Sequence, residues 1–168
     1  MAEVAAAAEV SQGLAYRYFA NKEAIFSALL EQVIQVALAG MPRILEMPGT
    51  PGERLEFLIS SAWNGRREYP ELYQLMYQVL SDEAIPDNLR KLVDRQGQSY
   101  QDVARQLIVE GQATGEVAEG DPDQMVSIVL ASLDGLSRWA LSEPEQFKKN
   151  FPDAGIILRI FKPHSDPK

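Results

Sequence analysis

The stretch from Val4 to Phe26 constrains the fold more than any other part of the sequence. It contains a short run of small residues, a turn at Glu9-Val10, a second short segment with aromatic residues, and the start of a third segment at Asn21. Two short helices that cross closely need small residues on the first, and Ala5 and Ala8 provide them. This layout predicts a helix-turn-helix followed by a connecting helix.

The residue inventory excludes several classes of catalytic site. The 168 residues include no cysteine, which excludes disulfides, thiolate metal sites and cysteine nucleophiles. The single histidine, His164, lies in a C-terminal segment with prolines and lysines, so histidine-based catalysis and metal binding inside the fold are excluded as well. No spaced acidic pair on an apolar face and no glycine-rich cofactor loop is present. We therefore expect no enzymatic activity, no catalytic residues, no metal and no cofactor.

Charge and hydropathy limit the partners. The formal net charge of −8 argues against diffuse binding to nucleic acid, although a small DNA-binding region can function within an acidic protein. No apolar run approaches the ~20 residues of a membrane span. The N-terminus also lacks the basic start of a secretory signal. We expect a cytoplasmic protein without a membrane partner.

Helix signals dominate the rest of the chain. Asn21, Thr50 and Asp121 are each placed to cap a helix, and the last two precede a proline at the first helical position. Apolar residues recur with a period near 3.6. We predict helices over residues 21–45, from Pro51, from Pro70, over 87–115, over 121–142 and over 154–161. Pro42 is expected to weaken the first of these helices, and the predicted fold class is all-α.

The second helix of the head is predicted to read DNA. It runs from Gln12 to Phe19, with Ser11 as its cap. Outward residues of its N-terminal half would meet base edges, where Gln12 can pair with adenine and Leu14 can touch a thymine methyl. Tyrosine hydroxyls and Lys22 suit phosphate oxygens. From the pattern alone, ordinary packing by Tyr16 and Tyr18, with Arg17 as a surface charge, remains the alternative.

Three motifs in combination resemble a known family. Val-Ala-x-x-Ala-x-Val-Ser-x-Gly, Tyr-x-Tyr-Phe and Asn-Lys-Glu-x-Ile-Phe, at residues 4–13, 16–19 and 21–26, closely resemble the N-terminal motif of the tetracycline-repressor (TetR) family of bacterial transcription regulators. The resemblance implies that Ser11, Gln12, Gly13 and Leu14 begin the recognition helix. It also implies that Tyr16, Tyr18 and Lys22 touch the DNA backbone, and that Phe19 and Phe26 join the head to the connecting helix.

The chain departs from the family pattern in three ways. Glu9 stands where glycine is usual, so a strained turn is expected. Leu14-Ala15 replaces a polar residue followed by a large aliphatic one, which thins the core of the head. The family's first helix has no counterpart here, so we expect an incomplete head. In residues 1–32, Arg17 and Lys22 face four glutamates, and the net charge of two minus four, or −2, predicts weak non-specific DNA affinity.

The resemblance also implies a C-terminal domain that binds a small molecule and dimerises. We divide the chain into a head with the start of the connecting helix, residues 1–40, and a ligand-binding and dimerisation domain, residues 41–168. Aromatic and soft apolar residues are the candidates for lining a pocket for an apolar or aromatic effector. These are Trp63, Tyr73, Met76, Tyr77, Tyr100 and Trp139. Ordinary core packing is the alternative for each, and no charged pair stands out as a counter-ion for a ligand.

One stripe of the late helix is the candidate dimer interface. Small residues at Ser132 and Gly135 would let a second helix approach closely. The stripe consists of Ile128, Ser132, Gly135 and Trp139. Packing against the core of its own subunit is the alternative.

Two functions follow from these observations. The first is a ligand-responsive transcriptional regulator, expected to be a repressor that binds a two-fold operator in double-stranded DNA as a homodimer and is released by a small-molecule effector. The second is a helical ligand-binding or dimerisation module that does not bind DNA because its head is incomplete.

Overall fold

The structure is a computed structural model that describes residues 2–80 and 86–163. His164 lies outside these residues. Within them the chain forms α-helices, one short 3₁₀ turn and no strand, which confirms the predicted all-α class. The elements are α1 (Ala2–Ala7), α2 (Gln12–Tyr18), α3 (Lys22–Leu45), α4 (Pro51–Glu68), α5 (Pro70–Leu80), α6 (Asp87–Thr114), α7 (Pro122–Ser142), α8 (Pro144–Asn150), α9 (Ala154–Leu158) and η1 (Arg159–Phe161).

The predicted helix caps are present. The side chain of Asn21 accepts a hydrogen bond from the backbone N–H of Ala24 at 2.8 Å. Thr50 accepts from the N–H of Glu53 at 3.3 Å, and the Glu53 carboxylate accepts from the N–H of Thr50 at 2.8 Å, which completes a reciprocal capping box. Asp121 caps α7, because its side chain accepts hydrogen bonds from the backbone N–H groups of Asp123 and Gln124. These bonds fix where α3, α4 and α7 begin.

The connecting helix α3 runs through Pro42 to Leu45, which confirms its predicted end. The predicted domain boundary at residue 40 therefore falls inside one continuous helix. The short helix α8 was not predicted, although Pro144 at its first position and Glu145 in its first turn are helix-start signals.

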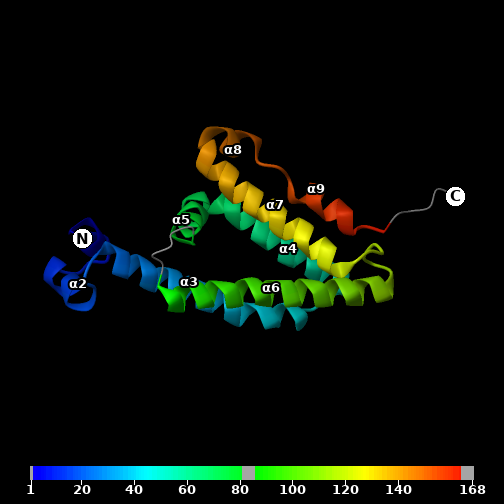
Figure 1. Ribbon diagram of the computed structural model, residues 1–168, viewed down its shortest axis with the longest axis horizontal. Helices are drawn as coiled ribbons and strands as arrows, with labels where there is room; N and C mark the ends of the chain where they lie inside the picture. The colour runs from blue at the N-terminus through cyan, green and yellow to red at the C-terminus, as the bar shows by residue number, and fades with distance from the viewer. Residues whose placement is uncertain (1, 81–85, 164–168) are drawn as a thin grey trace.

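The helices enclose a main core and a smaller second one. Figure 1 shows the head, α1 and α2, at one end of α3, with α3 and α6 side by side and α7 crossing over α4. The main core lies between α4, α6, α7 and the C-terminal helices, and Leu107 and Ile108 of α6 are fully buried in it. A second cluster of Leu30, Ile34 and Leu89 joins α3 to α6 nearer the head.

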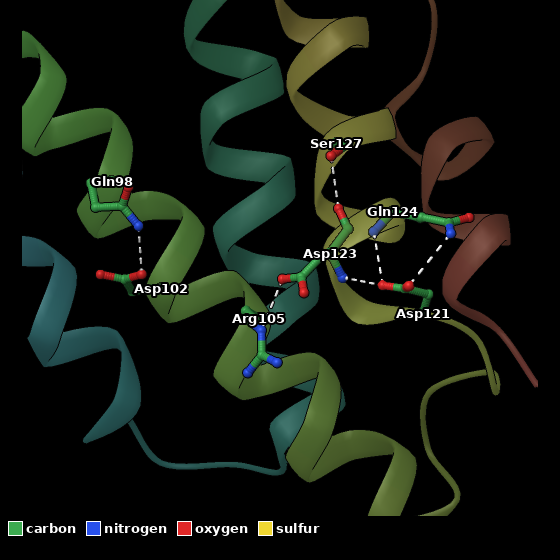
Figure 2. A network of polar contacts seen from close by, with 7 residues as sticks. All are labelled: Gln98, Asp102, Arg105, Asp121, Asp123, Gln124 and Ser127. Atoms are coloured by element: carbon green, nitrogen blue, oxygen red, sulfur yellow. Dashed lines mark hydrogen bonds and ion pairs between the residues drawn. The ribbon is translucent and has the colours of Figure 1, made fainter.

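Polar contacts join α6 to the start of α7 on the surface (Figure 2). The guanidinium of Arg105 forms an ion pair with Asp123 at 2.8 Å. Ser127 donates to the backbone carbonyl of Asp123 at 2.8 Å, and Asp121 caps the same helix end. Because Arg105 and Asp123 are both exposed, this ion pair adds about 1 kcal/mol at most. It fixes the direction in which α7 starts more than it stabilises the fold.

The hydropathy of α3 corrects one sequence expectation. Residues Ala24–Leu45, 22 residues with a mean hydropathy of 1.6, are long and apolar enough to cross a membrane by length and composition. The charges of Glu31 and Arg43 concealed this run from the sequence reading. In the structure, α3 packs along α6 through Leu30 and Ile34, and only 11% of its most apolar stretch is buried inside the chain.

Candidate functional site

The turn between α1 and α2 is built as the sequence predicts. Glu9 adopts a left-handed backbone with φ of 55°, as the family's glycine position requires. The N–H of Val10 returns to the carbonyl of Ala5 at 2.9 Å, which closes α1. Ser11 then caps α2 by accepting from the N–H of Leu14 at 3.2 Å. The head therefore has the local geometry of a helix-turn-helix.

Replacement of Glu9 by glycine is expected to stabilise the head. A non-glycine residue in the left-handed region costs roughly 1–2 kcal/mol, so Glu9→Gly should gain about 1 kcal/mol after the extra entropy of glycine is subtracted. The matched control is Glu3→Gly in the first turn of α1, which should lose about 1 kcal/mol. Hydrogen exchange of the amides in residues 2–18 measures the two variants. If both substitutions increased the protection of these amides, or if neither did, the result would contradict the turn geometry.

The residues predicted to read DNA lie on the surface of the head. All of them are exposed, and Tyr18 is 72% accessible. They are Ser11, Gln12, Gly13, Leu14, Tyr16, Arg17, Tyr18 and Lys22. Among the side chains described in residues 2–20, only Ala5 is buried, at 2% exposed. The head thus presents its predicted contact surface, but it has very little core of its own.

Phe26 has a different place from the one that the resemblance implied. It packs against the cluster of Leu30, Ile34 and Leu89 and so joins α3 to α6 of the body. Phe19, at the end of the head, is only half-buried. The link between head and body therefore runs along α3, and Phe26 marks the point where α3 enters the body.

A cavity of about 680 Å³, partly open to solvent, lies between the helices of the body. Its walls come from α3, α4, α5, α6 and α7, and its lining is mostly apolar. Four of the residues proposed from the sequence for a ligand pocket line it: Tyr73, Met76, Tyr77 and Tyr100. The volume is typical of sites for small organic ligands. The role of these residues in binding a ligand stays a prediction.

The two tryptophans do not line this cavity, which corrects the sequence expectation for them. Trp63 is buried in the main core, where its indole N–H donates to the carbonyl of Pro152 at 2.9 Å. Trp139 packs edge-on against Phe147, with ring centres 5.6 Å apart. Both hold the C-terminal segment on the bundle. The positions of the two tryptophans depend on partners that are distant in the sequence or outside the helix, so the local sequence pattern did not predict them.

Arg66 is the cavity residue that sequence reasoning missed. It lies on the same stripe of α4 as Leu55, Ile59 and Ala62, and it faces the cavity together with Tyr73 and Tyr100. A cation that continues an apolar stripe at a spacing of three or four residues was the available signal. Its presence means that the polar lining includes a positive charge.

Neutral groups hold Arg66 in place. Its Nε donates to the carbonyl of Leu133 at 2.9 Å and to the hydroxyl of Ser137 at 3.1 Å, and its Nη1 donates to the carbonyl of Ala62 at 2.7 Å. The guanidinium also lies 4.6 Å from the ring centre of Tyr73. Among the described residues no carboxylate forms an ion pair with it, because the nearby Asp134 pairs with Arg138 at 3.0 Å. Burial lowers the pKa of Arg66, although it stays charged.

Tyr100 places an unsatisfied hydroxyl at the same cavity. The side chain is 5% exposed, and its buried oxygen has no hydrogen-bond partner. Burial raises the pKa of Tyr100 and the charge of Arg66 opposes that rise, so the phenol stays neutral at physiological pH. An unpaired buried hydroxyl costs roughly 1–3 kcal/mol. The cavity therefore contains a cation and an unused hydroxyl that interact electrostatically with each other.

Removal of the Tyr100 hydroxyl is expected to stabilise the chain. Tyr100→Phe deletes a buried group without breaking a hydrogen bond, so the free energy of unfolding should rise by about 1 kcal/mol. The control is Tyr69→Phe, where the side chain is 60% exposed and the change should stay within about 0.5 kcal/mol. Urea unfolding of the ligand-free protein measures both, and a loss of stability in Tyr100→Phe would mean that the hydroxyl has a partner.

The stripe predicted as a dimer interface is mostly exposed. Ile128 is 50% exposed, Ser132 bonds back to the carbonyl of Ile128 at 2.8 Å, and a methyl group added at Gly135 would meet no atom within 4 Å. Trp139, in contrast, is packed against its own chain. The first three residues leave an accessible face on α7. In the described part of the chain no group of three or more His, Cys, Asp or Glu side chains is placed to hold a metal.

Known proteins resemble this chain in the sequence of its head and in its overall fold. Residues 1–29 match the family model described as bacterial regulatory proteins, tetR family. A search of curated proteins found no match. These 29 residues contain α1, α2 and the start of α3, the segment that carries the proposed reading surface.

Solved structures with the same fold cover nearly the whole chain. The regulator FadR from Bacillus subtilis, solved with stearoyl-CoA, is 20% identical with a TM-score of 0.64 over 95% of this chain and 84% of its own. A TetR/AcrR-family regulator from Thermobifida fusca is 22% identical, with a TM-score of 0.66 and coverage of 94% and 80%. The TetR-family regulator PfmR from Thermus thermophilus is 19% identical, with a TM-score of 0.67 and coverage of 94% and 86%.

A family of regulatory proteins accords with the expectation that the chain is not an enzyme. The match to the tetR family model is confined to residues 1–29, and the solved structures show that the chain shares their fold over nearly its whole length.

Proposed function

We propose that this chain is a ligand-responsive DNA-binding transcriptional regulator. It acts as a repressor that binds a two-fold operator as a cytoplasmic homodimer, and a small-molecule effector releases it. The observation that carries the proposal is a head that matches the tetR family model, joined by one continuous helix to a cavity of about 680 Å³.

The head supports the DNA-binding part of the proposal. Gln12, Leu14 and Arg17 are exposed on α2, which has the place of a recognition helix in this fold. Lys22 begins α3 beside it and is available for a phosphate. Gln12 would supply sequence information through a base edge, whereas Lys22 would fix the position of the head.

The connecting helix α3 supports coupling between the two sites. Its first turn follows the head directly, and its second half, from Val33 to Ile44, forms one wall of the cavity. A ligand that fits one position of α3 better than another shifts the population of the two states. In a dimer, such a shift changes the distance between two heads that must reach major grooves roughly 34 Å apart.

The lining of the cavity supports an effector with a large apolar part. Met76, Val93 and Leu130 contribute side chains from three different helices. Among the similar structures, the Bacillus subtilis FadR was solved in complex with stearoyl-CoA, so the same fold holds a molecule with a long acyl chain. The effector of this chain is therefore proposed to be an apolar or amphiphilic organic molecule.

The exposed stripe of α7 supports the proposed dimer, and Gly135 provides its test. An added Cβ there meets no atom of its own chain within 4 Å, whereas a bulky side chain would block a second copy, so Gly135→Trp should leave a folded monomer. Gly135→Ala is the size control and should stay dimeric. Light scattering after gel filtration gives the mass of each variant, and a Gly135→Trp variant that remains dimeric would place the interface elsewhere.

Selection of DNA tests the proposed function. Full-length protein is mixed with random duplexes, bound molecules are amplified, and the enriched sequence is footprinted. The proposal predicts two inverted half-sites one helical turn apart. Enrichment of no sequence would eliminate it.

The second candidate is a ligand-binding or dimerisation module without DNA binding. The observation that favours it is the thin head, in which Ala5 is the one buried side chain among those described in residues 2–20. Under this hypothesis, amides of residues 2–18 exchange rapidly while those of α4, α6 and α7 stay protected. Failure of DNA selection together with this exchange pattern would favour the second candidate.

A further inference from the structure

We infer that the cavity binds a carboxylate with an apolar chain, and that Arg66 and Tyr100 hold its carboxylate group. This inference rests on the proposed function because it names the class of effector that the cavity takes. It starts from two polar groups that the fold leaves incompletely satisfied at one apolar cavity.

The first group is the guanidinium of Arg66. The hydrogen bonds that it forms with protein groups engage Nε and Nη1 and not Nη2, and the Arg66 side chain lines the cavity. Its acceptors are carbonyls and a hydroxyl, all of them neutral. The nearby Asp134 acts on this charge, but its ion pair is with Arg138, so the partly buried guanidinium can still be matched by an anion that enters from the cavity.

The second group is the hydroxyl of Tyr100. It is a buried donor without an acceptor, and its side chain lines the same cavity as Arg66. A carboxylate has two oxygens, so it can accept from Arg66 and from Tyr100 at once. A neutral ligand that accepts only from Tyr100 would leave the charge of Arg66 unmatched.

The rest of the lining defines the other end of the ligand. Val33, Ile34 and Met76 give this part of the lining an apolar surface that suits a hydrocarbon chain, and the other arginine of the lining, Arg43, is exposed to solvent. Asp134 also lines the cavity, but its carboxylate is held in the ion pair with Arg138. An anion at the Arg66 end and a hydrocarbon elsewhere describe an amphiphilic carboxylate, such as a medium-chain alkanoate.

Calorimetric titration of the full-length chain with decanoate and with 1-decanol tests the inference. The two probes share a chain length and differ in charge. Decanoate should bind at least roughly tenfold more tightly, because hydrogen bonds to a charged group are the stronger ones. Equal affinity for both probes, or no binding of decanoate, would overturn the inference.

Substitutions at the two residues separate recognition from structure. Arg66→Gln should weaken decanoate by roughly thirtyfold and Tyr100→Phe by roughly tenfold, whereas 1-decanol should change less than about threefold in Arg66→Gln. Arg67→Gln, at an exposed neighbour, and Tyr69→Phe are the matched controls. If Arg66 served only to hold α4 on α7, its loss would weaken both probes equally. Tyr100→Phe breaks no protein hydrogen bond and keeps the test valid if Arg66→Gln does not fold.

A third probe distinguishes a free acid from a thioester. Decanoyl-CoA carries no carboxylate at its acyl end, so its affinity should not depend on Arg66. A thirtyfold loss for decanoyl-CoA in Arg66→Gln would contradict the inference. All of these titrations are done without DNA. Binding of decanoate by a chain that fails DNA selection would therefore reject the proposed function and leave this inference standing.

Discussion

Gly111→Ala is expected to lower the free energy of unfolding by about 2 kcal/mol. Gly111 is buried in α6, and a methyl group there would collide with the side chain of Val117, whose Cβ lies 3.1 Å away. Val117 has no room to retreat, because it is 3% exposed and its N–H bonds to the carbonyl of Gly111 at 3.0 Å. The chain can fold back over the end of α6 only if position 111 has no side chain.

Gly97→Ala in the same helix is the matched control. It makes the same chemical change, but no atom lies within 4 Å of the added methyl group. Its expected effect is a gain of about 1 kcal/mol, because alanine has the higher helix propensity. Urea unfolding followed by far-ultraviolet circular dichroism measures both variants. The same sign for both would mean that Val117 moves aside.

Arg17→Ala is expected to reduce affinity for the selected operator by at least roughly tenfold, because each of the two heads in a dimer loses one contact. With Arg17 and Lys22 as the cations of the first 32 residues, a dimer brings about four of them to the DNA. The slope of log affinity against log salt should therefore not exceed about −4 in magnitude, and Arg17→Ala should make it shallower.

Lys148→Ala is the control for this prediction. Lys148 is an exposed cation on α8, which Figure 1 shows at the top of the body and separate from the head. Its loss should leave the affinity unchanged, and fluorescence anisotropy with a labelled duplex measures all three proteins over a range of salt concentrations. Equal losses from Arg17→Ala and Lys148→Ala would show that DNA contacts the chain outside the head.

Local features were predictable from the sequence because their partners are a few residues away. Thr50 and Glu53 cap each other across three positions, and the strained turn at Glu9 follows from one residue type at one place in a motif. The all-α class and most helix starts belong to this group. The short helix α8 carried the same signals, but it is only seven residues long.

Features that depend on tertiary packing were not predictable in the same way. The pairing of Trp63 with the carbonyl of Pro152 spans 89 positions, so its place in the core could not be read from its neighbours. The cavity requires five helices to be placed in space. Arg66 was overlooked for a related reason. The role of a charged residue on an apolar stripe can be recognised only when the tertiary structure shows that Tyr100 lines the same cavity.

The affinity of the full-length chain for its selected operator, compared with a scrambled duplex of the same length and composition, tests the central claim most directly. The account predicts that the operator binds at least roughly a thousandfold more tightly at physiological salt. It also predicts that Gln12→Ala, which removes a proposed base contact on α2, lowers this ratio. Equal affinity of the unaltered chain for the two duplexes would contradict the assignment of α1 and α2 as a DNA-reading head.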